Sequence, residues 1–124
     1  MPLEDTVQLF ATLNVALFDT AVACWDARYF YNFWRPATAI ARAGKHANSD
    51  TEADVNWTSL LTTPAHPEYV SGHSAFSSAA ATVLTECLGT DAVTFIVRSD
   101  TLPKEQRKFT SLQACVEERG TSRV

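Results

Sequence analysis

A single long helix is the feature that most constrains the fold of this chain. Apolar residues recur every three or four positions, which is the spacing of an amphipathic helix, at Leu3, Val7, Phe10, Leu13, Leu17, Ala21 and Trp25. We predict a helix from residue 3 to about residue 33. Pro36 ends or kinks it, because proline has no amide hydrogen to donate and disfavours helical geometry at Arg35 before it.

The rest of the chain predicts further helices and little else. The predicted elements, in order, are a short helix from Pro36 to Ala43 stopped by Gly44, a loop over residues 45–56, one turn over residues 57–61, a helix from Ser71 closed by Gly89, an extended piece over residues 93–97, and a helix that starts at the Thr110–Gln113 capping box and ends at Gly120. A chain of 124 residues suits one domain at most. The predicted fold is all-α, a helix bundle or part of one, over residues 1–124.

Composition excludes several classes of function. Hydrophobic residues make up 46% of the chain, charged residues 19%, and the net charge is −4, which indicates a globular protein and argues against nucleic-acid binding. The most apolar stretch, Leu9–Cys24, contains Asn14 and Asp19, so we expect no membrane span, and the N-terminus lacks the basic start of a signal peptide. The compartment and the oligomeric state are left open.

The cysteines and histidines do not predict a metal site. Cys24, Cys87 and Cys115 lie far apart, which predicts buried free thiols. His46, His66 and His73 lack the spacing of metal ligands on a helix.

Ser71-Gly72-His73 is the first candidate for chemistry. A helix that begins at a serine offers unpaired backbone amides, the positive end of the helix dipole and a hydroxyl, and glycine lets an anion approach closely. His73 in the first turn is placed to exchange a proton with such an anion. The alternative is an ordinary helix cap.

Arg28 and Arg35 are the second candidate. Seven residues span nearly two helical turns, so we expect both guanidinium groups on one helix face, roughly 10 Å apart, where they can grip one tetrahedral oxyanion. Aromatic residues surround them, which favours partial burial, at Trp25, Tyr29, Phe30, Tyr31, Phe33 and Trp34. The alternative is a solvated arginine pair.

Together these motifs resemble a known signature. Arg28-x6-Arg35-Pro36, Ser71-Gly72-His73 and Ser122-Arg123 are similar to the K-x6-R-P, P-S-G-H and S-R-x5-H motifs of the vanadium-dependent haloperoxidase and type 2 phosphatidic acid phosphatase superfamily, in its soluble haloperoxidase-like branch. Arg28 stands at the family's lysine, and Val70 at the proline before serine. The chain ends one residue after Arg123, before the third-motif histidine. The expected domain therefore lacks its C-terminal part.

The resemblance implies a role for each matching residue. Arg28, Arg35 and Arg123 would neutralise the oxygens of vanadate or phosphate, the Ser71 hydroxyl and the Gly72 amide would add hydrogen bonds, and His73 would act as acid and base. His66 stands where bromide-oxidising members tend to have histidine, so it would tune protonation of bound peroxide. The implied cofactor is vanadate, and no other metal is expected; the implied partners are small anions, peroxide and halide.

Three functions remain open from the sequence. The first is peroxide-driven halide oxidation in the complete family site, inactive in this chain because the family's covalent histidine is absent. The second is a soluble acid phosphatase that uses the same anion site. The third is a non-catalytic helical remnant with a weak oxyanion pocket. Whether the chain is an enzyme is therefore undecided at this point.

Overall fold

The computed structural model describes residues 1–45 and 48–122. The chain divides into two compact units: Met1–Cys24 together with Ser71–Val124, and Trp25–Val70. Helix α1 (Leu3–Tyr31) begins in the first unit and ends in the second. Each unit is described by itself below.

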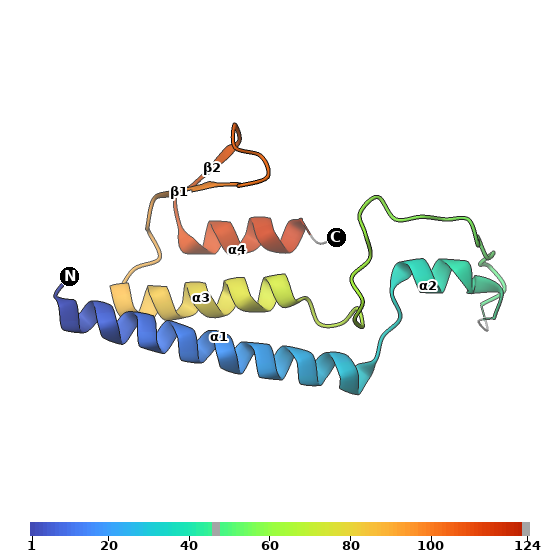
Figure 1. The fold of residues 1–124 in the computed structure, drawn as a ribbon, viewed down its shortest axis with the longest axis horizontal. Coiled ribbons are helices and arrows are strands. Elements are labelled where there is room, and N and C mark those ends of the chain that lie inside the picture. The colour runs from blue at the N-terminus through green and yellow to red at the C-terminus, as the bar shows by residue number, and fades with distance from the viewer. Residues whose placement is uncertain (46–47, 123–124) are drawn as a thin grey trace. The chain divides into compact units, whose positions relative to one another are not determined.

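The first unit is helical with one small hairpin. After α1 it contains α3 (Gly72–Leu88), strands β1 (Phe95–Arg98) and β2 (Gln106–Phe109), and α4 (Leu112–Thr121). Helices α3 and α4 make the most extensive contact between elements and run in opposite directions (Figure 1). The predicted all-α bundle is confirmed in its broad form by these helices.

The hairpin is only partly anticipated by the sequence. The predicted extended piece over residues 93–97 corresponds to β1, which pairs antiparallel with β2 and brings Phe95 opposite Phe109. The two rings lie 5.4 Å apart between centroids, which is a stabilising cross-strand aromatic contact. The second strand is not predicted, because its Gln106-Arg107-Lys108 run is polar and lacks a strand's apolar alternation.

The caps predicted for α3 are confirmed, whereas the N-cap predicted for α4 is off by one residue. Ser71 is the N-cap of α3, and Gly89 closes this helix with φ of 68°, both as predicted. The cap of α4 is Ser111 rather than Thr110, and its Oγ accepts a hydrogen bond from the Ala114 amide at 3.0 Å. The Gln113 backbone amide donates to Asp91 Oδ1, and the Gln113 side chain donates to Glu117. Gln113 therefore makes neither hydrogen bond of the predicted capping box.

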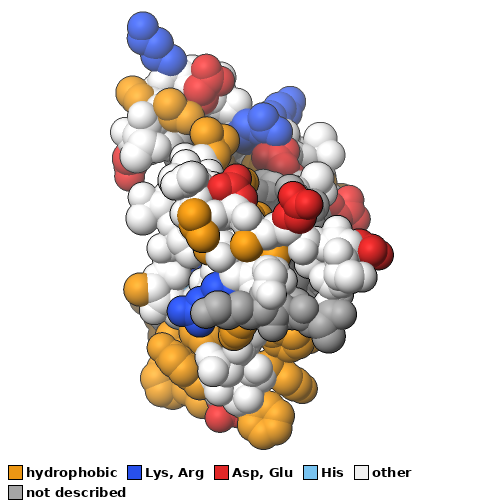
Figure 2. All heavy atoms as spheres, turned by 90° about the vertical axis from the view of Figure 1, so that its right-hand side faces the viewer, with side chains coloured by type: hydrophobic (Ala, Val, Ile, Leu, Met, Phe, Trp, Pro, Cys, Tyr) orange, Lys and Arg blue, Asp and Glu red, His pale blue; other side chains and the backbone are white. Residues whose placement is uncertain are grey.

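The predicted packing face of α1 is only partly correct, since Leu13, Leu17 and Ala21 on the predicted stripe are partly buried. Leu9 and Cys24 are the buried apolar residues of this helix, whereas Leu3, Val7 and Phe10 on the predicted stripe are exposed. Apolar residues lie on every side of α1, so periodicity does not single out one face. Figure 2 shows many hydrophobic side chains on the surface of one face of the molecule. The expectation of three buried thiols is also wrong, since Cys87 is exposed.

The second unit holds a short helix and a long irregular segment. Helix α2 (Pro36–Ala41) is followed by a 3-10 turn over Ala43–Lys45, so Gly44 lies inside a turn instead of stopping the helix. The Asp54 amide donates to the Ile40 carbonyl, and the Glu68 amide donates to the Phe33 carbonyl. These two bonds join the irregular segment after α2, at Asp54 and Glu68, to residues 33–40, which follow α1. Residues 57–61 form no helical turn.

The stretch Leu3–Ala41 is long and apolar enough, by length and composition alone, to cross a membrane. This finding differs from our expectation that no segment of the chain approaches this limit. It is weak evidence by itself, because core helices of soluble proteins pass the same test.

The cap of α4 gives a direct test of this fold. Ser111→Ala should lower the free energy of unfolding by about 1 kcal/mol, because it removes the acceptor of the Ala114 amide. Thr110→Ala is the matched control and should change stability little. Urea unfolding followed by circular dichroism measures both; equal losses for the two variants would contradict the assigned cap.

Candidate functional site

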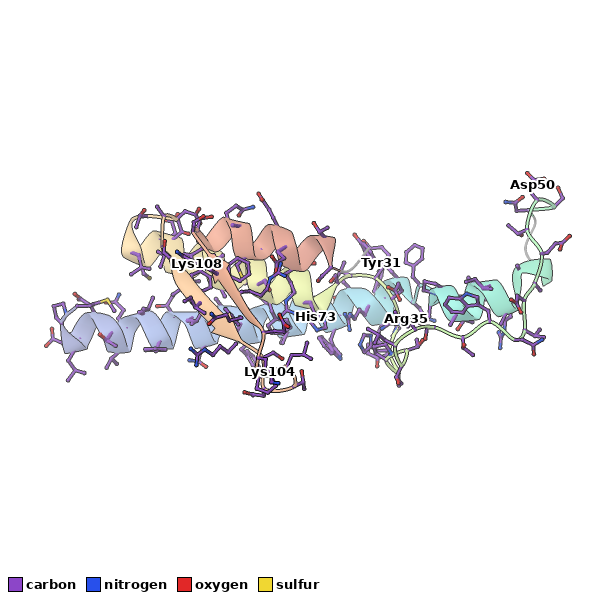
Figure 3. The ribbon with its side chains drawn as sticks, turned by 90° about the horizontal axis from the view of Figure 1, so that it is seen from above. Tyr31, Arg35, Asp50, His73, Lys104 and Lys108 are labelled. Carbon is purple, nitrogen blue, oxygen red and sulfur yellow. The ribbon has the colours of Figure 1, made fainter. Side chains whose placement is uncertain are left out.

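The break between α1 and α2 positions the two arginines of the first motif. Arg28 lies in the last turn of α1, which ends at Tyr31 because Asn32 adopts a left-handed φ of 47°. Arg35 lies past the break, with extended backbone at the N-cap of α2, as expected for a residue before proline. Tyr31 and Arg35, labelled in Figure 3, flank this break. The prediction that both arginines share one helix face is therefore wrong.

The segment over residues 66–70, here called the return loop, anchors both guanidinium groups by their Nε atoms. Arg28 Nε donates to the Val70 carbonyl oxygen at 2.9 Å. Arg35 Nε donates to the His66 carbonyl oxygen at 2.8 Å. Each arginine thus uses its Nε–H group to bind a backbone carbonyl oxygen. Its terminal Nη atoms are left to bind other groups.

Those terminal atoms meet at the imidazole of His66. Arg28 Nη1 lies 2.8 Å from Nδ1 and 3.0 Å from Nε2 of this ring. Arg35 Nη2 lies 2.7 Å from the same Nδ1. A guanidinium group can only donate hydrogen bonds, whereas the Pro67 carbonyl oxygen, 3.0 Å from Nδ1, can only accept them, so the role of each ring nitrogen is set by the tautomer of His66. Two guanidinium groups converge on one imidazole ring, although they come from different elements.

The two arginines differ in how their charge is balanced. Arg35 pairs with Glu68, whose Oε2 lies 2.7 Å from Nη1. Arg28 is only 4% exposed. The ion pairs among the described residues are Arg35–Glu68 and Arg107–Glu118, and Arg28 takes part in neither. The Trp25 ring, 4.7 Å from the Arg28 Cζ, gives a cation–π contact instead. Arg28 is therefore a buried cation without a carboxylate partner among the described residues.

The predicted burial of the arginines is confirmed, but the aromatic residues around them do not all contribute. Trp25 packs against Arg28, and the side chain of Arg35 is 13% exposed. Tyr29, Phe30 and Phe33 are exposed. The return loop supplies much of the remaining contact, through the hydrogen bonds described above.

The start of α3, in the first unit, carries the second motif. Ser71 Oγ accepts hydrogen bonds from the Ser74 amide at 3.3 Å and from the Ser74 hydroxyl at 3.1 Å, so its own proton remains a donor. Gly72 is buried and contributes a first-turn amide, which has no acceptor within the helix. His73 follows in the same turn and is labelled in Figure 3. This geometry is that of a capped helix N-terminus with donors suited to an anion.

The structure brings together some of the predicted site residues and adds others. Arg28, Arg35 and His66 form one cluster in the second unit, and Ser71, Gly72 and His73 form the helix start in the first. Arg123 lies outside the described residues. Sequence reasoning missed Glu68 and the Val70 carbonyl, because neither an ion pair across 33 residues nor a backbone acceptor leaves a local pattern.

Comparison with known proteins identifies the family. A model of the VCPO second helical-bundle domain matches residues 8–124. The chain belongs to this family. It is 28% identical over 81 residues to the vanadium chloroperoxidase of Curvularia inaequalis, which covers 60% of this chain and 13% of that protein. A crystal structure of the first bacterial vanadium-dependent iodoperoxidase matches with a TM-score of 0.78 and 35% identity, over 96% of this chain and 27% of that one.

Membership of this haloperoxidase-like family agrees with the resemblance seen in the motifs. The chain spans 13% and 27% of the lengths of these two relatives. Within residues 1–45 and 48–122, no three His, Cys, Asp or Glu side chains gather as a metal-binding group. The donors around Arg28 and Arg35 suit an oxyanion better than a bare cation, since guanidinium groups repel metal ions and bind oxygen acceptors.

The backbone anchors of the arginines predict a spectroscopic signature. The Nε–H protons of Arg28 and Arg35 should exchange slowly with water, because each is bonded to a carbonyl oxygen. Proton–nitrogen spectra selective for arginine Nε should show two protected signals, one lost in Arg28→Lys and the other in Arg35→Lys. Arg119, exposed on α4, serves as the control and should exchange fast. Equally fast exchange at all three arginines would disprove the anchored geometry.

Proposed function

We propose that Arg28 and Arg35 bind a tetrahedral oxyanion, and that the whole protein holds vanadate there for peroxide-driven oxidation of halide. The burial of Arg28 without a carboxylate partner among the described residues is the observation that supports this most strongly. A buried charge is costly unless it is paired, so such a guanidinium favours an anionic ligand. Membership of the haloperoxidase-like family supports vanadate as that ligand.

The residues of the chain would divide the work of binding. Arg28 and Arg35 supply positive charge and directed donors for the oxygens, and Arg123 is proposed to add a third guanidinium group. The Ser71 hydroxyl and the Gly72 amide supply neutral donors from the start of α3. We propose that these donors act on the same anion. When bound, vanadate would activate peroxide as a Lewis acid.

His73 and His66 have separate proposed tasks. His73 follows the Ser71 cap in the first turn of α3, and we propose that it gives and takes the proton needed by bound peroxide or by a leaving alcohol. His66 contacts both arginines through its ring, so a change at His66 alters the donors that face the anion. This contact supports the proposal that His66 tunes the site.

Anion binding by the chain tests the first part of this proposal. Phosphate or vanadate should shift the Gly72 amide signal in a nuclear magnetic resonance titration, with a Kd on the order of millimolar, or roughly −4 kcal/mol. Arg35→Ala should weaken binding several-fold or more, because it removes one positive charge and its donors. Lys104→Ala, on the β1–β2 hairpin (Figure 3), is the control and should leave binding nearly unchanged. A folded sample that responds to no oxyanion at low salt would refute the proposal.

Activity of the full-length protein tests the second part. Loaded with vanadate, it should oxidise bromide or iodide with hydrogen peroxide, and Arg35→Ala should abolish most of that turnover while sparing the fold. A phosphatase would instead hydrolyse a phosphate ester without peroxide, and vanadate would inhibit it. Robust ester hydrolysis with no halide oxidation would replace the haloperoxidase proposal with the phosphatase.

A further inference from the structure

We propose that the imidazole of His66 is an internal competitor for the arginine pair, so that an oxyanion binds only when this ring moves away. The inference rests on the proposed function, because it concerns the same two arginines. This role of His66 differs from the one implied by the family resemblance, which is to tune the protonation of bound peroxide. His66 would set how readily the anion enters.

The first argument is that ring and anion require the same donors. Arg28 Nη1 and Arg35 Nη2 lie 2.8 Å and 2.7 Å from Nδ1 of His66. An anion oxygen bonded to those two atoms would stand at about the same distance from each. The oxygen and the ring nitrogen would thus compete for the same two donor atoms. Because both groups need the same donors, binding of one weakens binding of the other.

The second argument is that the arginines do not depend on the imidazole for their placement. Arg28 is held by Val70, and Arg35 by the backbone carbonyl of His66 rather than by its side chain. Rotation of the His66 side chain leaves both of these bonds in place. The imidazole can therefore leave while both Nε anchors remain.

The His66 ring is partly open to solvent and has two further neighbours besides the arginines. His66 is half-buried, the Trp25 ring lies 5.9 Å away at a tilt of 53°, and the Pro67 carbonyl oxygen is 3.0 Å from Nδ1.

Glu68 adds a second internal competitor, at Arg35 alone. Its carboxylate binds Nη1, the remaining terminal nitrogen of Arg35. Glu68 is 44% exposed on its side chain, so water screens this pair and it is weaker than a buried one. Of the two contacts, the one made by His66 engages both arginines, and it should dominate the competition.

The test is phosphate binding by the chain with His66→Phe. Phenylalanine keeps a flat ring beside Trp25 but has no nitrogen to accept from the arginines. We expect phosphate to bind several-fold to ten-fold more tightly than in the wild type, with a faster association rate. Adding Arg35→Ala to this variant should abolish the gain, which shows that the tighter binding uses the arginine pair. Equal or weaker binding in a folded His66→Phe chain would overturn the inference.

Glu68→Gln and Glu118→Gln form a matched pair of controls. Both remove a carboxylate from an arginine, but only Glu68 contacts Arg35, whereas Glu118 pairs with Arg107. Glu68→Gln should tighten phosphate binding less than His66→Phe does, and Glu118→Gln should leave it unchanged. A gain in Glu118→Gln as large as that in His66→Phe would contradict the assignment, because it would reflect overall charge.

A measurement on the wild type keeps the inference testable if the variant does not fold. In a phosphate titration, the carbon-bound ring protons of His66 should shift with the same midpoint as the Gly72 amide, while the Arg28 Nε–H signal stays protected. A ring that does not respond while the Gly72 amide does would overturn the competition and leave the proposed function standing. Failure of phosphate to bind either the wild type or the variant would overturn the proposed function itself.

Discussion

The burial of the Arg28 guanidinium group is the constraint on which the rest of the site depends. Arg28 is 4% exposed at the end of α1, and a cation in that position needs acceptors. The return loop supplies them through the Val70 carbonyl and the His66 ring. The same loop bonds to Arg35, so one segment orients two arginines from different elements. The loop, rather than the periodicity of a helix, creates the convergence of the two charges.

Local signals in the sequence predicted the helix ends better than the site. Ser71 and Gly89 bound α3 as expected, because a serine cap and a left-handed glycine act within one turn of the chain. The spacing and the aromatic setting of Arg28 and Arg35 singled them out as candidates for anion binding. Their geometry did not, because Asn32 reverses the helical φ and places Arg35 outside α1.

Long-range contacts account for the rest of what the sequence missed. Glu68 reaches Arg35 across 33 residues, and β2 pairs with β1 through a register that sets Phe109 opposite Phe95. The packing face of α1 was predicted only in part because this helix is apolar on all sides. Such helices are typical of positions inside large bundles. This agrees with the match to a helical-bundle family. The chain spans 27% of the length of the similar iodoperoxidase.

The central claim is that Arg28 and Arg35 bind one oxyanion together. Crystals soaked in orthovanadate locate the vanadium directly by its anomalous scattering. The account predicts a peak whose oxygens lie within hydrogen-bonding distance, about 3 Å, of terminal nitrogens of both arginines. A peak bound elsewhere, or to one arginine with the other turned away from it, would contradict the claim.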